Sequence, residues 1–232
     1  MENLKSFLMQ RRIHRRSKHD GKGGEYMNGI DVIEVIRAIG SRIEAEKEFL
    51  TELDNVIGDG DHGINMARGF HAVEEKLNGL EDKDIGTILK MVGMTLVSTV
   101  GGASGPLYGT AFMKAGMSMA GKTKLEMEGF LSCMDEAIGG VQARGKAKQG
   151  EKTMLDAMIP AQQAMRQALS DGKDNRAVLA AGVAAARKGV EYTKTIIATK
   201  GRASYVGERS IGHQDPGATS FTDILEVIAQ GI

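Results

Sequence analysis

Hydrophobic residues recur along most of this chain at three- and four-residue steps, which place them on one face of a helix. One such stripe begins after Ile30 and predicts a helix that ends near Asp54. Its members are Ile33, Ile36, Ile39, Ile43, Leu50 and Leu53. Similar stripes predict helices at about 64–77, 85–98, from 106 onward, 124–143, 153–169, 176–198 and 218–230. The pattern therefore predicts eight helices.

Strand patterns are almost missing from the sequence. Alternating runs of β-branched and aromatic residues are rare, and aromatic residues make up only 4% of the chain. Most connections between the predicted helices are short, so neighbouring helices should run antiparallel. The segment "AVLAAGVAAARKG" in the helix at 176–198 is rich in small residues and permits close helix contacts. We predict a single all-α domain of eight antiparallel helices over residues 27–232.

Composition narrows the class of protein. A chain of 232 residues can bury a large core, and its single cysteine, Cys133, cannot form an intrachain disulfide. We expect a buried thiol in a reducing compartment, and hence a cytoplasmic protein. Thirty basic and thirty acidic residues cancel, which argues against nucleic acid and anionic membranes as partners. The longest apolar run, at 178–186, is far shorter than the ~20 residues that span a bilayer.

Residues 1–26 differ from the rest of the chain. They hold seven Lys and Arg against three Asp and Glu, with the cluster "RRIHRR" at 11–16. The segment lacks the apolar core of a secretory signal, and "HDGKGGEYMNG" at 19–29 is typical of a flexible joint. We interpret 1–26 as a basic, disordered extension, or as an upstream start preceding an initiator at Met27. A nucleic-acid arm and an organelle presequence are the alternatives.

The stretch "DNVIGDGDHGINMARG" carries the first candidate chemistry. It places Asp54, Asp59 and Asp61 within eight residues, among glycines, where one helix ends and the next begins. Like charges this close repel one another, and a bound cation removes that penalty. Carboxylate oxygens are hard ligands suited to Mg²⁺ or Ca²⁺. The spacing therefore favours a divalent metal site.

This stretch has two other interpretations. An EF-hand is excluded, because counting from Asp59 puts Gly63 at the fifth ligand position and Phe70 at the twelfth. Alternatively, Asp54 ends one helix and Asp61 caps the next, while the glycines only turn the chain. That role suits one aspartate but does not explain three.

The glycine-rich segment "GGASGPLYGT" at 101–110 precedes another predicted helix. It offers backbone N–H groups and the Ser104 hydroxyl beside a helix N-terminus, an arrangement that binds phosphate. The alternative is a simple turn between helices, with glycines for positive φ. Together with three aspartates, the segment indicates metal plus phosphate, and hence a nucleotide.

Two further loops interrupt the helical pattern. "GKAKQGEKT" at 145–153 departs from the P-loop pattern, because Glu151 separates the second glycine from Lys152 and no strand precedes it. We therefore exclude a P-loop and expect its lysines to face solvent. The polar connection 199–217, which holds Arg202, Arg209, His213 and Asp215, is long enough to be either functional or mobile.

Four motifs together resemble the ADP-binding L subunits of dihydroxyacetone kinases. They are "LDNVIGDGDHGINMARGF", "GGASGPLYGT", "GKAKQGEKTMLDAM" and "GRASYVGERSIGHQDPGATS", and the resemblance covers about residues 28–230. It implies a barrel of eight antiparallel helices with ADP or ATP at one end. It also implies that Asp54, Asp59 and Asp61 coordinate two Mg²⁺ ions. The implied nucleotide contacts are His62, Gly63, Ile64, Asn65, Ala103, Ser104, Gly145, Met154, Arg202, Asp215, Pro216 and Gly217.

Several of these residues have side chains suited to the nucleotide contacts that the resemblance implies. Asn65 and Ser104 supply neutral hydrogen bonds, and Arg202 offsets phosphate charge. Gly145 and Met154 allow close approach and apolar packing against adenine. His62 is either a solvent-facing imidazole or a phosphate contact, and beside the aspartates we favour a phosphate contact over a phospho-acceptor.

The resemblance implies a kinase subunit of the phosphoenolpyruvate-glycerone phosphotransferase type. A phosphohistidine-carrying subunit of the phosphotransferase system would recharge bound ADP, and the phosphoryl group would pass to dihydroxyacetone on a separate K subunit. No segment here is long enough to be the K domain. The alternatives are an ATP-exchanging subunit serving another small ketose and a non-catalytic, ADP-binding regulatory protein. A homodimer is left open.

Overall fold

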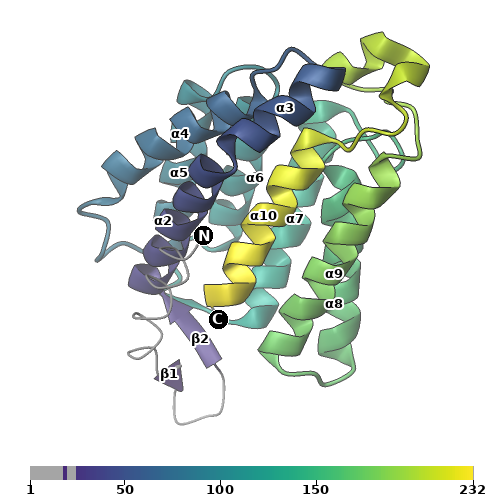
Figure 1. Ribbon diagram of the computed structural model, residues 1–232. Coiled ribbons are helices and arrows are strands. Elements are labelled where there is room, and N and C mark those ends of the chain that lie inside the picture. The colour runs from purple at the N-terminus through teal and green to yellow at the C-terminus, as the bar shows by residue number, and fades with distance from the viewer. Residues whose placement is uncertain (1–17, 20–24, 232) are drawn as a thin grey trace.

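The computed structural model describes residues 18–19 and 25–231 and is almost entirely helical. Figure 1 shows long helices standing side by side around a common axis. The helices are α2 (Gly29–Ala45), α3 (Lys47–Ile57), α4 (His62–Leu77), α5 (Ile85–Thr99), α6 (Ser104–Ser118), α7 (Met127–Gly145), α8 (Leu155–Ser170), α9 (Asn175–Thr193) and α10 (Pro216–Gly231). A 3-10 helix, η1 (Arg202–Ser210), lies between α9 and α10. The all-α prediction is confirmed.

The long helices form a closed ring. Each contacts its neighbour in chain order from α4 to α10, and α2 closes the ring by packing against both α4 and α10. Successive helices run in opposite directions, which the short connections require. The connections at 58–61, 100–103, 146–154 and 194–215 therefore meet at one end, here called the loop end. Those at 78–84, 119–126 and 171–174 meet at the opposite end, here called the far end.

The first predicted helix is in fact two helices. The backbone leaves helical geometry at Glu46, where α2 ends and α3 begins. The buried stripe continues across the break, because Ile43 and Leu50 on either side are both fully buried. Hydrophobic periodicity therefore identified the buried face but could not reveal the break.

Other boundaries also differ from the sequence prediction. Helix α7 begins at Met127 and not near 124, because Lys124 and Leu125 form strand β3 (Lys124–Leu125), which pairs with β2 (Glu25–Asn28). Strand β2 also corrects the predicted joint at 19–29, of which 20–24 lie outside the described residues. Helix α9 ends at Thr193 and not near 198, and η1 occupies part of the predicted loop 199–217.

The N-terminal extension falls largely outside the described residues. Of residues 1–26, the structure describes strand β1 (Lys18–His19), which pairs with β2, and Glu25 and Tyr26 within β2. The basic cluster at 11–16 is not among them, so its interpretation stays a prediction.

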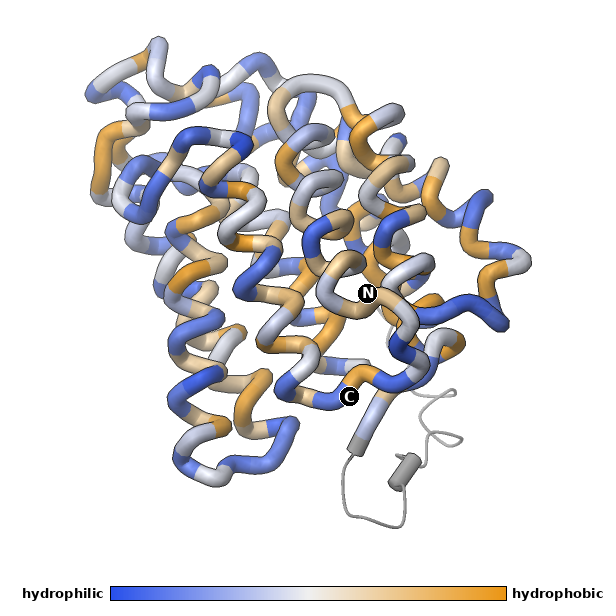
Figure 2. The backbone as a smooth tube through the Cα atoms, turned by 180° about the vertical axis from the view of Figure 1, so that it is seen from behind, coloured by the Kyte–Doolittle hydropathy of each residue, from blue (hydrophilic) through white to orange (hydrophobic). Residues whose placement is uncertain are grey.

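The core fills the inside of the ring. Along each helix in Figure 2, hydrophobic and hydrophilic positions alternate in short steps, as an amphipathic wall requires. The small residues of α9 allow very close packing, since a Cβ added at Gly189 would lie 2.1 Å from the Asp156 carbonyl oxygen of α8. Cys133 is buried, as expected. Over the described part of the chain, no helix is both long and apolar enough to cross a membrane.

Candidate functional site

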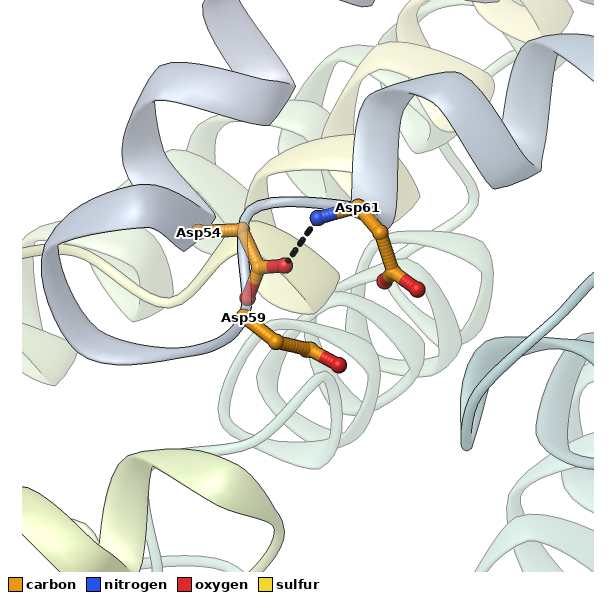
Figure 3. Close-up of side chains that lie close together, drawn as sticks. All are labelled: Asp54, Asp59 and Asp61. Atoms are coloured by element: carbon orange, nitrogen blue, oxygen red, sulfur yellow. Dashed lines mark hydrogen bonds between the residues drawn. The ribbon is translucent and has the colours of Figure 1, made fainter.

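The three aspartates of the opening motif converge at the loop end. Asp54 lies in the last turn of α3, Asp59 in the following turn, and Asp61 immediately before α4, as Figure 3 shows. One carboxylate oxygen from each lies within 4.8 Å of the other two. Asp54 is buried, Asp61 is half-buried and Asp59 is exposed. The cluster thus has a fixed inner side and an open outer side.

The turn around Asp54 explains the glycines. The Oδ2 atom of Asp54 accepts hydrogen bonds from the amides of Asp61 (2.9 Å) and His62 (3.2 Å). A Cβ at Gly58 would lie 2.0 Å from Asp54 Oδ1, so only glycine lets the chain pass this carboxylate. Gly60 has a φ of +73°, a left-handed value that suits glycine. The sequence therefore folds this turn over Asp54.

The alternative role of Asp61 as a helix cap is wrong. Asp61 occupies the N-cap position of α4, but within the described chain its side chain makes no capping hydrogen bond. Its carboxylate instead points toward the same space as that of Asp59 (Figure 3). Three hard oxygen ligands on one open face fit a Mg²⁺ site that is completed by water or phosphate.

Arg202 connects η1 to the acidic cluster. Its Nε lies 2.8 Å from Asp59 Oδ2, and its side chain is two-thirds exposed. An exposed ion pair of this kind adds little stability. It does place a permanently charged guanidinium beside the aspartates, as the resemblance implied.

His62 is buried, which excludes the solvent-facing interpretation. Its Nδ1 is 2.9 Å from Ser104 Oγ, and its Nε2 is 2.9 Å from Ser220 Oγ. Ser220 Oγ is also 2.7 Å from the hydroxyl of Tyr108. Burial lowers the pKa of His62 to about 4, so the imidazole is neutral at pH 7. Because both ring nitrogens contact hydroxyls, His62 orients Ser104 at the start of α6.

A cavity of about 360 Å³ opens at the loop end, a size common for small-molecule sites. Twelve of the fifteen residues expected from the sequence line it. They are Asp54, Asp59, Asp61, His62, Ala103, Ser104, Gly145, Met154, Arg202, Asp215, Pro216 and Gly217. Arg144 and Lys200 add further positive charge to the lining. The cavity is thus acidic where a metal would sit and basic around it.

The other three expected residues lie outside this lining. Gly63 is buried where α4 meets α3, and Ile64 is half exposed. Asn65 is buried, and its Oδ1 accepts a hydrogen bond of 2.6 Å from Arg68. Their expected contacts with a nucleotide stay predictions.

Asp215 is a second buried acid at this end. Its Oδ2 accepts a 2.7 Å hydrogen bond from the Ala218 amide in the first turn of α10. Burial raises the pKa of Asp215 to about 7, with smaller contributions from the nearby carboxylates of Asp156 and Asp54. The Asp215 side chain therefore fixes the start of α10 beside the cavity.

Sequence reasoning missed several residues of the site. Ser220 reaches the site through His62, and Tyr108 lines the cavity and contacts Ser220. The spacings of Tyr108 from Ser104, four residues, and of Ser220 from Gly217, three residues, are the signals that could have found them. The expectation that the lysines of 145–153 face solvent is wrong for Lys152, which is 1% exposed and lines the cavity. Its neighbours Lys146 and Lys148 are exposed, as expected.

A model of the DAK2 domain matches residues 56–230, which include most of the cavity lining. The chain belongs to the DAK2 domain family. It is 46% identical over 198 residues to the PEP-dependent dihydroxyacetone kinase, ADP-binding subunit DhaL, of Escherichia coli K12, covering 85% of this chain and 94% of that protein. It is 43% identical to the corresponding PTS-dependent subunit of Lactococcus lactis, covering 85% and 96% of the two chains.

The fold has a solved counterpart. The dihydroxyacetone kinase of C. freundii, crystallised with AMP-PNP and Mg²⁺, matches with a TM-score of 0.65 at 22% identity. The match covers 94% of this chain but only 37% of that kinase. This likeness supports the helical barrel.

Proposed function

We propose that this chain is the nucleotide-carrying subunit of a dihydroxyacetone kinase. The observation that carries the proposal is the convergence of Asp54, Asp59 and Asp61 beside a cavity that also contains the uncapped start of α6. Two dihydroxyacetone kinase subunits that are similar to 85% of this chain are named ADP-binding. ADP or ATP with two Mg²⁺ ions is therefore the proposed occupant.

The donor set fits Mg²⁺. Asp59 and Asp61 present their carboxylates to the open side, and Asp54 holds the turn while offering one carboxylate oxygen to the cluster. Magnesium, when bound, neutralises phosphate charge and favours in-line displacement. The protein's own contribution is to position three anionic oxygens on a turn that is fixed by two backbone hydrogen bonds.

Phosphate oxygens would meet the start of α6. Ser104 begins this helix, where N–H groups and the positive end of the helix dipole attract anions. Neutral His62 orients the Ser104 hydroxyl without competing for the metal's negative ligands. Arg202 would exchange its contact with Asp59 for a contact with phosphate.

The proposed cycle needs two partners. A phosphohistidine-carrying subunit of the phosphotransferase system recharges ADP, and a K subunit presents dihydroxyacetone. In this cycle, the present chain keeps the nucleotide bound between turnovers. Retention of this kind suits a site in which the nucleotide contacts four loops of one rigid barrel.

Substitution of Asp59 tests the metal assignment. Asp59→Ala should abolish Mg²⁺-dependent ADP retention and leave the helical circular dichroism unchanged, because Asp59 is exposed and its ion pair with Arg202 is also largely exposed. Bound ADP is measured by mass spectrometry after desalting. Asp82→Ala, an exposed acid at the far end, is the matched control and should retain ADP. Full ADP retention by Asp59→Ala would refute the assignment.

The alternatives differ in donor and acceptor. An ATP-exchanging subunit would turn over with ATP in place of phosphoenolpyruvate, or with another small ketose, when mixed with candidate K and donor subunits. A regulatory protein would bind ADP but transfer no phosphoryl group in any mixture. The intact aspartate cluster favours catalysis over regulation.

A further inference from the structure

Lys152 has an unusual position for a lysine. Its side chain is 1% exposed and is among the largest fully buried side chains in the described chain. Its φ of +59° is a left-handed value that residues other than glycine seldom adopt. Such a conformation persists only where the surroundings fix it.

The surroundings consist of backbone carbonyls from two other segments. The Lys152 ammonium donates to the carbonyl oxygens of Thr193 and His213, and it lies 3.5 Å from that of Ile196. Three acceptors match the three N–H donors of an ammonium group. Thr193 ends α9, so the positive charge also meets the negative end of that helix dipole.

These carbonyls belong to the segments that build the nucleotide cavity. His213 lies two residues before Asp215, and the Asp215 amide donates a 2.9 Å hydrogen bond to Thr193 Oγ1. On the other side, Lys152 lies two residues before Met154. Met154 and Gly217 are close enough that a Cβ added at Gly217 would lie 3.5 Å from Met154 Cβ.

We infer that Lys152 is a positioning residue of the nucleotide site. Its ammonium fastens segment 146–154 to the end of α9 and to segment 213–217, which holds Met154 and Gly217 next to each other in the cavity lining. The effect of Lys152 on ADP binding rests on the proposed function. The hydrogen bonds of its ammonium, which hold the segments together, are present in the protein without nucleotide.

Lys146 provides a matched control. It lies in the same connection and also has positive φ, +48°, but it is exposed at the end of α7. Replacing either lysine by glycine relieves the same backbone strain. Only Lys152→Gly removes a buried side chain and its ammonium, so the difference between the two variants reports on that side chain.

The first measurement is ADP affinity in Mg²⁺ by calorimetry. Lys152→Gly should weaken ADP binding by about tenfold or more, and Lys146→Gly by less than about twofold. Butylammonium reproduces the lysine chain and its donors, so it should restore ADP affinity to Lys152→Gly. Tetramethylammonium has no N–H donor and should not. Wild-type ADP affinity in Lys152→Gly would overturn the inference.

The second measurement is amide hydrogen exchange without nucleotide. The amides of Ala198, Gly212 and Asp215 bond across the fastened segments and should exchange faster in Lys152→Gly, while those of α5 stay unchanged. Unchanged exchange at all three would overturn the inference. The exchange measurement tests the inference even if the wild-type protein binds no ADP. Absence of ADP binding by the wild-type protein would refute the proposed function. If Lys152→Gly does not fold, Lys152→Met is used in its place. This variant keeps an apolar side chain of similar length and removes the ammonium, and the same two measurements then test the inference.

Discussion

The two ends of the barrel differ in how most of their helices begin. At the far end, Asn28, Asp84 and Asp174 each accept a hydrogen bond from an amide in the first turn of the helix that follows. At the loop end, α4, α6 and α8 begin at Asp61, Ala103 and Met154, whose side chains make no capping bond within the described residues.

Two helices depart from this contrast: α7 at the far end has no bond from its N-cap Glu126 in the described chain, and α10 at the loop end is capped by the bond between Asp215 and the Ala218 amide. The far end therefore caps most of its helices with their own side chains, whereas three helix starts at the loop end lack such a bond, which fits the proposed binding of a ligand there.

Buried polar side chains show the same contrast. Near the loop end lie His62, Lys152, Asp215 and Ser220, all buried and hydrogen-bonded to one another's segments. The connections of the far end contain mainly exposed polar residues, such as those at 81–83. Burying polar groups costs free energy unless each is paired. The cost of the buried polar groups at the loop end is consistent with the binding role proposed for that end.

Among the substitutions that test this comparison of the two ends, Gly63→Ala should have the largest effect. A Cβ there would lie 2.0 Å from the Lys47 carbonyl oxygen and 2.5 Å from Thr51 Oγ1, so α4 would have to move away from α3. We expect a loss of about 3 kcal/mol in the free energy of unfolding, measured in urea, together with weaker ADP binding.

The control for Gly63→Ala is the same substitution at Gly139 in α7. No described atom lies within 4 Å of a Cβ added there, so Gly139→Ala should stabilise the protein by about 0.5–1 kcal/mol. Equal effects at the two glycines would contradict the claim that the start of α4 is held tightly in place.

We expect a substitution of Asp223 to have an effect of intermediate size. Asp223 lies in the middle of α10, between the two ends of the barrel. Burial raises the pKa of Asp223 to about 6, although its hydrogen bond from Arg42 opposes the shift. Its Oδ2 atom is buried without a partner in the described chain. The folded state therefore holds a proton that the unfolded state releases, and stability falls as pH rises from about 4 through about 6.

Asp223→Asn removes this titration, and about 2 kcal/mol of pH-dependent stability should disappear with it. Urea unfolding at several pH values measures the slope. A slope unchanged by Asp223→Asn would show that other groups cause it.

Asp84→Ala should have the smallest effect. The Asp84 carboxylate accepts hydrogen bonds from the amides of Thr87 and Gly121 at the far end. Its loss should lower the free energy of unfolding by about 1 kcal/mol and leave ADP affinity unchanged. Asp84→Ser should recover most of that stability. A clear loss of ADP affinity in Asp84→Ala would show that the two ends do not act separately.

The sequence predicted most of the fold, for a physical reason. Burial of one helix face requires apolar residues at a fixed period, so the stripes revealed the helices and their connections. The end of a helix depends on contacts with distant segments. Glu46 interrupts a continuous stripe, and α9 ends where Lys152 meets its last carbonyl groups, so neither boundary was predictable from local pattern.

The part of the candidate site that could be predicted consists of residues that lie close together in the sequence. Asp54, Asp59 and Asp61 lie within eight residues, and their spacing alone indicated a metal site. Lys152 and Ser220 were missed because their partners are far along the chain, at His213 and His62. A lysine in a polar turn is usually exposed, and only the fold shows that this one is buried.

The most direct test of the account is a crystal structure with ADP and Mn²⁺ in place of Mg²⁺, with anomalous diffraction to locate the metal. We expect manganese peaks in contact with Asp54, Asp59 and Asp61, and the ADP phosphates between these peaks and the start of α6. Manganese or ADP bound elsewhere, with these three carboxylates free of metal, would contradict the central claim that the loop end is the nucleotide site.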